Sequence, residues 1–186
     1  MNKPYRRHAI AAVSIVIAAL SGAQAAAEEQ FPARPLQMII PFAAGGPTDI
    51  VGRILGGKMS ELLGQTVVVE DRGGAGGTIG AAVVAKAAPD GYTMVMATVS
   101  TNAINPALYR HLPYDSETAF TPVGRIGVTP TILMANLSLP VTDVKSLIAL
   151  IKKNPGKYSY GSSGVGSILH LCGAEFTADA GGLQMV

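Results

Sequence analysis

The sequence predicts an α/β fold built on a parallel β-sheet. Apolar runs of strand length at residues 36–40, 67–69 and 93–97 alternate with segments whose apolar residues recur at helical spacing. The order strand, helix, strand, helix, strand favours parallel strands joined by right-handed crossovers. A hydrophobic content of 48% with 22 glycines and 12 prolines is typical of a folded chain with many sharp turns.

The first strand passes through a glycine turn into a helix. The run at 36–40 predicts a buried strand, Gly45 and Gly46 predict the turn, and Pro47 suits the first helical position. The N–H groups of a first helical turn have no acceptor within the helix and lie at its positive end, so this junction is a candidate anion site. Asp49 either caps the helix or orients a ligand.

The next two elements follow the same alternation. Gly64 is expected to end the first helix, and the β-branched run at 67–69 then forms the second strand. Thr78 opens an alanine-rich helix that reaches about Ala88, and the turn at 89–91 leads into the third strand. The glycines at 73–77 do not match the G-x-G-x-x-G fingerprint, which favours a packing turn over a dinucleotide loop.

A second alternation follows an irregular crossing segment at 106–120. Strands are predicted at 121–126, 131–135 and 158–160, and a helix capped by Thr142 at 143–153. A further helix starts at Ser167, and a strand begins at Leu183. Residues 158–171 repeat the strand, glycine and helix pattern of the first junction, so the two junctions predict one ligand held between two helix ends. His170 either contacts that ligand or satisfies a backbone carbonyl.

The N-terminus predicts export. Lys3, Arg6 and Arg7 precede an apolar run at 9–20 and an A-x-A cleavage site at 23–25 or 25–27, so residues 1–27 are a predicted signal peptide. The run is shorter than the ~20 residues that span a bilayer, so no membrane anchor is expected after cleavage. Cleavage leaves eleven basic residues against twelve acidic ones, which argues against nucleic acid as a partner.

The sequence offers little for catalysis or cofactors. Adjacent Glu70 and Asp71 point apart in an extended segment, and no His, Cys or carboxylate cluster has the spacing of a metal site. The glycines at 52–57 precede Lys58 as in a phosphate loop, but Met59 replaces the required hydroxyl residue. No G-x-S-x-G elbow is present. A binding protein without cofactor is therefore predicted, with an exported enzyme that uses the loops as an oxyanion site as the alternative.

Five short motifs follow one another along the chain. They are PFAAGGPTD at 41–49, VVVEDR with GAGGTIG at 67–80, PDGYT at 89–93, INPALY with LPYD at 104–115, and YGS with GVGSILHL at 160–171. In this order they resemble the Bug family, the extracytoplasmic solute receptors of tripartite tricarboxylate transporters. The resemblance runs from about residue 31 to residue 186.

The resemblance implies a two-lobed fold like that of type II periplasmic binding proteins, with both lobes incomplete in this chain. Residues 28–105 would form the first part of lobe 1, residues 106–120 the segment between the lobes, and residues 121–186 the first part of lobe 2. The implied role is a periplasmic receptor that captures a small carboxylate and delivers it to the membrane components of the transporter. A module that presents its ligand to a membrane sensor is a further alternative.

The resemblance also implies the residues that contact the ligand. They lie on the loops after the first strand, after the third strand and before the last helix: Phe42, Ala43, Gly45, Gly46 and Asp49; Thr98, Ser100 and Asn102; Ser162, Gly166, Ser167 and His170. Two positions depart from the family pattern, since Asp71 stands where Asn is usual and Gly73 where Pro is usual.

Family members usually continue beyond this length and complete both lobes. A chain of this length would leave strand edges and helix faces uncovered, and such edges invite association. We therefore expect a truncated product that is marginally stable, associates, lacks a sharp thermal transition and binds carboxylates far more weakly than a full-length relative.

Overall fold

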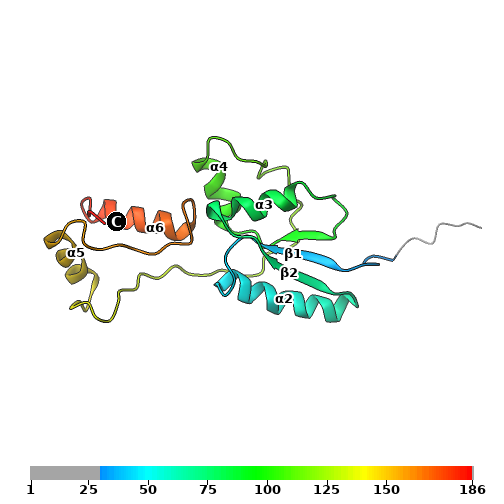
Figure 1. Cartoon of the computed structure of the whole chain (residues 1–186), viewed down its shortest axis with the longest axis horizontal. Helices are drawn as coiled ribbons and strands as arrows, with labels where there is room; N and C mark the ends of the chain where they lie inside the picture. The colour runs from blue at the N-terminus through cyan, green and yellow to red at the C-terminus, as the bar shows by residue number, and fades with distance from the viewer. Residues whose placement is uncertain (1–29, 186) are drawn as a thin grey trace, which may run out of the picture. The chain divides into compact units, whose positions relative to one another are not determined.

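The computed structural model describes residues 30–185 (Figure 1). The predicted signal peptide lies outside this range. Arg34–Val186 form one compact unit, and the account below concerns the described part of that unit. Within residues 30–185, every helix is too short or too polar to span a membrane.

Three parallel strands form the sheet. The central strand β1 (Leu36–Ile40) lies between β2 (Val67–Asp71) and β3 (Thr93–Val95). Leu36 is opposite Val67, and Gln37 is opposite both Val68 and Thr93. The predicted parallel order is confirmed, although β2 is longer and β3 shorter than the apolar runs suggested.

Burial of β1 explains its continuous apolar sequence. Met38, Ile39 and Ile40 are at most 1% exposed, as expected for a central strand of a parallel sheet covered on both faces. Around β1 the core is completed by Val67 and Met96. The helices that follow β1 and β2 lie on opposite sides of the sheet in Figure 1, which is the arrangement that right-handed crossovers in opposite directions produce.

Helix α2 (Pro47–Leu63) packs on the sheet through two glycines and three partly buried aliphatic residues, Leu55, Met59 and Leu63. Gly52 and Gly56 are buried, and a Cβ on Gly56 would lie 2.9 Å from Val69. By contrast, Ile54 and Leu62 are at least 70% exposed. The helical spacing therefore predicted the helix correctly, but several of the apolar residues that revealed it face outward. Gly64 ends the helix in the left-handed conformation, with a φ of 66°.

Short helices surround the carboxyl end of the sheet. The 3₁₀ turn η1 (Ala75–Gly77) leads into α3 (Thr78–Ala85), which ends before the predicted Ala88. After β3 the chain forms a π-helical segment, η2 (Ser100–Ile104), and then the short helix α4 (Asn105–Leu108), whose last three residues lie in the segment predicted to be irregular.

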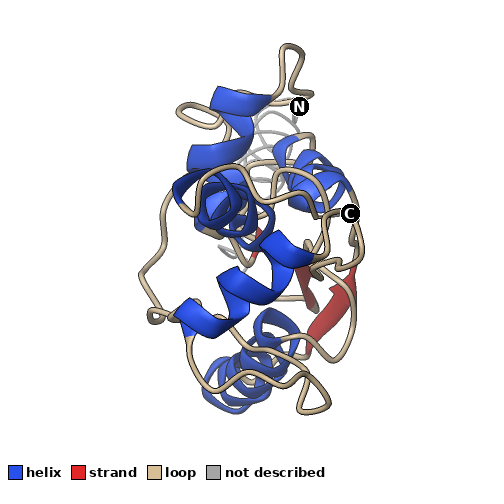
Figure 2. Ribbon diagram, turned by 90° about the vertical axis from the view of Figure 1, so that its left-hand side faces the viewer, coloured by secondary structure: helices blue, strands red, loops and turns tan. Residues whose placement is uncertain are grey.

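The predicted strands beyond residue 120 do not form. Residues 121–126, 131–135 and 158–160 have no strand partner in the described part of the chain. Figure 1 draws the yellow-green and orange segments that contain them as loops, which are tan in Figure 2. A strand exists only where a neighbour accepts its backbone hydrogen bonds, so β-branched composition alone was insufficient. The strand predicted from Leu183 is also wrong over 183–185, because the Leu183 N–H donates to the carbonyl of Thr177 on the preceding helix.

Two helices form in this region as predicted. They are α5 (Val144–Lys153) and α6 (Ile168–Asp179). Asp143, not Thr142, caps α5, because its carboxylate accepts the Ser146 N–H at 2.7 Å while the Ser146 hydroxyl receives the Asp143 N–H. The Ser146 backbone hydrogen bond lowers the pKa of Asp143 below its usual value.

Two glycines offer a matched test of how closely the helices approach the sheet. An added Cβ on Gly80 would lie 2.7 Å from the Arg72 carbonyl oxygen, whereas on Gly57 it would meet nothing within 4 Å. We expect Gly80→Ala to destabilise the sheet by about 1–3 kcal/mol or more and Gly57→Ala to stabilise it by about 0.5–1 kcal/mol. Amide hydrogen exchange of Met38 and Ile39 measures both changes. Unchanged exchange in Gly80→Ala would contradict the packing described.

Candidate functional site

The candidate site lies at the carboxyl edge of the sheet. The connection from β1 leads to β2 on one side, while β3 lies on the other side of β1. Open α/β sheets bind ligands where the connections diverge in this way, beyond the carboxyl ends of the strands. The loop at 41–46 follows β1 and the segment at 96–102 follows β3, so topology brings together two of the three predicted groups of binding residues.

The loop after β1 is closed by Asp49. The Gly45 N–H donates to Oδ2 of Asp49 at 2.8 Å, and the Gly46 N–H points to the Ala43 carbonyl at 3.4 Å. Gly45 has a φ of 79°, which glycine adopts without strain. The N–H groups of Thr48 and Asp49 have no acceptor among the described residues, so these two, not Gly45 and Gly46, are the open donors of α2.

Arg53 ties the start of α2 to the end of β2. Its Nε lies 2.6 Å from Oδ1 of Asp49, and its Nη2 lies 2.5 Å from Oδ2 of Asp71. Oδ2 of the buried Asp49 thus accepts the Gly45 N–H, whereas Oδ1 has the ion pair with Arg53 but no hydrogen-bond partner in the described part of the chain. The structure shows Asp49 closing the loop and leaves a contact between its Oδ1 and a ligand as a prediction. The second ion pair of Arg53 gives a partner to Asp71, one of the two departures from the family pattern.

The second departure has a steric consequence. A Cβ on Gly73 would lie 3.1 Å from the Phe42 carbonyl carbon and 3.2 Å from the Ala43 nitrogen. Such contacts are tighter than ordinary van der Waals separation, so glycine lets the loop after β2 approach the loop after β1 more closely than proline could. Phe42 itself is half-buried, and its ring lies against Gly77 of η1.

The segment after β3 presents hydroxyl groups. Thr98 accepts both the Thr101 hydroxyl and the Asn102 N–H through its carbonyl, which shapes the start of η2. The Thr98 hydroxyl oxygen is buried without a hydrogen-bond partner in the described part of the chain. Ser100 is 1% exposed, and its Oγ accepts the N–H of Ile168 at 3.1 Å. This bond joins the segment after β3 to the first turn of α6.

Ser167 positions the start of α6. It is fully buried as the N-cap residue, and its Oγ accepts the N–H of His170 at 3.2 Å. The Leu169 N–H has no acceptor among residues 30–185. The buried Nδ1 of His170 also has no hydrogen-bond partner there. The first turn of α6 thus keeps one open backbone donor beside an unpartnered imidazole nitrogen. Ser162 lies farther out and is exposed.

Two residues outside the predicted set, Asn105 and Tyr109, hold the loop before α6 in place. Asn105 is fully buried, and its Nδ2 donates to the Gly76 carbonyl and to the Thr78 hydroxyl, each at 3.0 Å. Its Oδ1 faces Gly166, where an added Cβ would lie only 2.7 Å away. The Tyr109 hydroxyl donates to the Val165 carbonyl at 3.0 Å. Asn105 and Tyr109 belong to the INPALY motif, and that motif was the only feature of the sequence that could have pointed to their role.

The turn η1 lies between the two predicted junctions. A Cβ on Gly77 would lie 3.3 Å from the Phe42 ring, while a Cβ on the adjacent Gly76 would lie 2.7 Å from the Val165 carbonyl oxygen. The segment after β3 therefore contacts the start of α6 directly. The loop after β1 is connected to the start of α6 only through η1. Among the described residues no direct hydrogen bond links residues 42–49 to residues 162–170.

A separate hollow of about 310 Å³ lies beside α4 and α6. It is lined by Ala103, Ile104, Ala107, Leu108 and Leu171, none of which is a predicted binding residue. With apolar walls it offers no donor for a carboxylate. Residues 30–185 also contain no group of three His, Cys, Asp or Glu side chains that could hold a metal ion.

Several solved structures are similar to this chain, among them the periplasmic binding protein BugD. A structure described as a periplasmic transporter is 47% identical, with a TM-score of 0.80 over 84% of this chain and 53% of its own. An R. palustris protein determined with adipate is 38% identical, with a TM-score of 0.79 over 84% and 52% of the two chains. MatC from Rhodopseudomonas palustris, determined with bound malate, is 33% identical, with a TM-score of 0.76 over 81% and 51%. The predicted fold class of periplasmic binding proteins is thereby confirmed.

The sequence comparisons identify the family. Residues 51–186 match the tripartite tricarboxylate transporter family receptor, TctC. BugT from Bordetella pertussis is 38% identical over 163 residues, which are 87% of this chain and 50% of BugT. A second protein from the same species, of the uncharacterised family UPF0065, is 38% identical over 170 residues, which are 91% and 52% of the two chains. This chain belongs to the TctC family of solute receptors, not to a family of enzymes, and it spans about half the length of the curated relatives it matches.

Asn105 allows a test of how the loop before α6 is held. Asn105→Ala removes two buried hydrogen bonds and strands the Gly76 carbonyl, so we expect a local destabilisation of about 1–3 kcal/mol. His111→Ala, at an exposed residue six positions later, serves as the control and should change stability by no more than about 0.5 kcal/mol. Hydrogen exchange of the Ile168 amide measures the loss at the contact with Ser100. Equal exchange in both variants would contradict the role assigned to Asn105.

Proposed function

We propose that this chain contributes the carboxylate-binding half of a periplasmic solute receptor. In this proposal one carboxylate of a small organic acid is held between the N-terminus of α2 and the N-terminus of α6. The receptor then passes the acid to the membrane components of a tripartite tricarboxylate transporter. Residues 1–27 act as the signal peptide that brings it to the periplasm.

The contact between Ser100 and Ile168 is the observation that carries the proposal. This hydrogen bond brings the first turn of α6 to the carboxyl edge of the sheet, where α2 also begins. Both helix ends keep backbone donors without acceptors among the described residues, at Thr48 and Asp49 on α2 and at Leu169 on α6. Two positive helix ends around one position favour an anion.

The charges of the site also favour recognition by backbone and hydroxyl groups. Arg53 lies near the start of α2, but two carboxylates already engage it. The Thr98 hydroxyl and the His170 Nδ1 are buried without partners in the described part of the chain, and buried polar atoms normally bind a water or a ligand. We infer that ordered waters complete the carboxylate shell, as such groups are too few to enclose an anion alone.

Relatives support the class of ligand. The R. palustris structure holds adipate and MatC holds malate, both of which are dicarboxylates. For this chain we propose a small carboxylate without naming the acid, because the second half of a full-length receptor would supply further contacts. In the same proposal residues 28–105 belong to lobe 1, residues 106–120 cross between the lobes, and residues 121–186 begin lobe 2.

Binding should require a free carboxylate. Saturation-transfer NMR with succinate, citrate, nicotinate and benzoate, each beside its amide, detects the weak binding expected of this chain. Signal should pass to at least one acid and not to its amide, because only the acid carries the charge that the helix ends attract. Equal transfer to an acid and its amide, or none to any acid at millimolar concentration, would overturn the proposal.

Two glycine variants, one at the proposed site and one away from it, add a second test of carboxylate binding. An added Cβ on Gly46 would lie 3.3 Å from the Ala43 carbonyl, so a β-branched residue would crowd the loop before α2. Gly46→Val should lower the affinity for every acid that binds by a similar factor. Gly57→Ala, on the exposed side of α2, is the control and should leave these affinities unchanged. An effect on one acid alone would place Gly46 in the selective part of the site instead.

A further inference from the structure

A single arginine side chain connects the end of β2 to the start of α2. Arg53 lies four residues after Asp49, a spacing that places both residues on one face of α2. Its Nε lies 2.6 Å from Oδ1 of Asp49, and its Nη2 lies 2.5 Å from Oδ2 of Asp71, the last residue of β2. We call Asp49, Arg53 and Asp71 the arginine clamp.

The arginine clamp is shielded from water at both carboxylates. The side chain of Asp49 is 6% exposed and that of Asp71 19%, whereas that of Arg53 is 51% exposed. Exposed ion pairs contribute little to stability, but a buried carboxylate that loses its counter-charge is strongly destabilised. Among the described residues, Arg53 is the one ion-pair partner of Asp49, so its removal should act chiefly there.

Asp49 transmits this restraint to the loop after β1. Its Oδ2 accepts the Gly45 N–H at 2.8 Å, and Gly45 makes the turn with a φ of 79°. The N-cap residue Gly46 has no side chain that could cap α2, and its N–H lies 3.4 Å from the Ala43 carbonyl. The bond to Asp49 is thus the shorter of the two that close the turn, and the ion pair with Arg53 holds its carboxylate.

The arginine clamp carries one negative charge in excess, because two carboxylates share one guanidinium. The neighbouring Glu70 has its own partner in Arg72, so that pair adds no net charge. Asp71 supplies the excess, since the asparagine usual in the family at this position would leave the clamp neutral. The N–H groups of Thr48 and Asp49, which lack acceptors in the described part of the chain, are therefore next to a net negative charge.

We propose that Arg53 positions the loop after β1 for carboxylate binding, and that Asp71 makes this site selective for acids of low charge. This role rests on the proposed function, in which the first turn of α2 holds one carboxylate. Arg53 does not touch the acid; it holds Asp49, which in turn holds the glycine turn. The excess charge repels each further charge of the ligand, so monocarboxylates and dicarboxylates are favoured over tricarboxylates.

The charges are close enough for this selectivity. One guanidinium group separates the two carboxylates of the clamp, so they lie roughly 8 Å apart or less, within about one Debye length at physiological salt. A unit charge about 10 Å from a ligand charge changes affinity by roughly two- to tenfold, depending on how much water lies between them. High salt should weaken the selectivity, because it screens charges at this range.

Exchange of the Gly45 amide tests the positioning role without any ligand. Arg53→Met keeps a long side chain and removes its charge, and we expect it to speed Gly45 exchange at least about tenfold. Arg53→Lys restores the charge and should recover part of the protection. Lys58→Met, which removes an exposed ion pair with Glu61 on the same helix, is the matched control and should change that exchange less than about twofold. Protection of the Met38 amide shows that a variant remains folded.

Acids of different charge test the selectivity. Asp71→Asn removes the excess charge, while its side-chain oxygen can still accept from Arg53. Saturation-transfer titrations of the full chain use citrate, succinate and benzoate, which carry three, two and one carboxylates. At low salt the gain in affinity should grow roughly two- to tenfold with each added carboxylate, and it should shrink in about 0.5 M salt.

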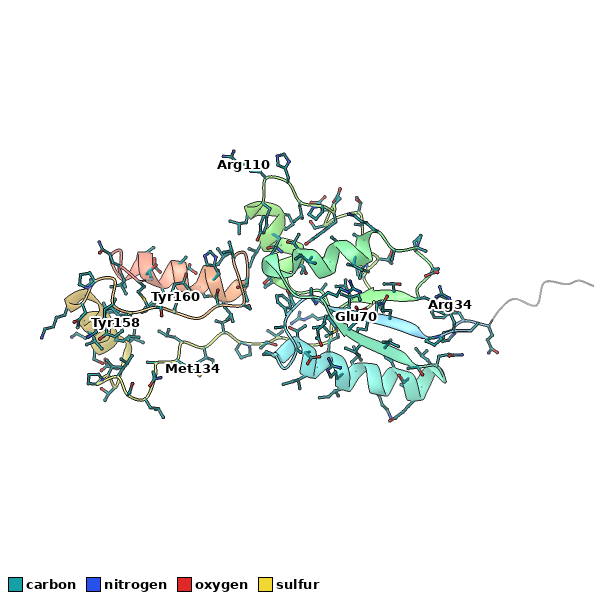
Figure 3. The ribbon with its side chains drawn as sticks, in the orientation of Figure 1. Arg34, Glu70, Arg110, Met134, Tyr158 and Tyr160 are labelled. Carbon is teal, nitrogen blue, oxygen red and sulfur yellow. The ribbon has the colours of Figure 1, made fainter. Side chains whose placement is uncertain are left out.

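A second charge removal controls for the net charge of the chain. Asp90→Asn removes the same charge, but Asp90 pairs with Arg34 before the strands begin. Arg34 and Glu70, both labelled in Figure 3, lie toward opposite ends of the strands, and Asp71 follows Glu70. Asp90→Asn should therefore leave the ratios of the three affinities unchanged.

Four results would overturn the proposal. Unchanged Gly45 exchange in folded Arg53→Met, or an equal change in Lys58→Met, removes the positioning role. If Arg53→Met loses the protection of Met38, Arg53→Lys takes its place, and wild-type exchange of Gly45 is then the contradicting result. Equal effects of Asp71→Asn on the three acids, or the same effects in Asp90→Asn, remove the selectivity and leave carboxylate binding intact. If no acid binds, the proposed function and the selectivity both fail, whereas Gly45 exchange still decides whether Arg53 holds the loop.

Discussion

Close backbone packing at the end of β1 is the constraint on which the site depends. A Cβ on Gly80 would lie 2.8 Å from the Pro41 Cα, and one on Gly73 would lie 3.1 Å from the Phe42 carbonyl carbon. The adjacent η1 brings Gly77 against Phe42 and Gly76 against Val165. Residues without side chains thus allow the loops after β1 and β2 and the loop before α6 to approach one another closely.

This packing gives several polar groups defined partners, while the Thr98 hydroxyl and the His170 Nδ1 keep none in the described part of the chain. Asn105 fills the space beside Gly76 and Gly166, and Ser100 receives the first N–H of α6. Asp49 closes the glycine turn before α2, and Arg53 balances its charge. The N–H groups of Thr48 and Asp49 on α2 and of Leu169 on α6 remain without an acceptor in the described part of the chain. These donors mark the place where we propose that an anion binds.

The sheet and most helices could be predicted because their signals are local. The buried run at 36–40 and the β-branched run at 67–69 each sit between turn residues, and Pro47 and Gly64 mark both ends of α2. Strands at 121–135 could not be predicted reliably, because their existence depends on a neighbour that the local sequence does not reveal. The buried face of α2 was partly hidden, since Gly52 and Gly56 lie in that contact beside Leu55, Met59 and Leu63, while Ile54 points to solvent.

The candidate site was predictable in outline and not in detail. The two strand-to-helix junctions were visible as patterns, but the use of the Gly45 N–H by Asp49 depends on a side-chain conformation that no sequence pattern specifies. The roles of Asn105 and Tyr109 depend on contacts across more than 25 residues of chain, to Gly76 and Val165.

Residue-specific ¹⁵N chemical-shift mapping with succinate tests the central claim most directly. If one carboxylate lies between the two helix ends, the largest amide shifts will occur at Thr48, Asp49 and Leu169, with succinamide causing none. Shifts confined to the apolar hollow lined by Ala103, Leu108 and Leu171, or confined to one helix end, would contradict the account.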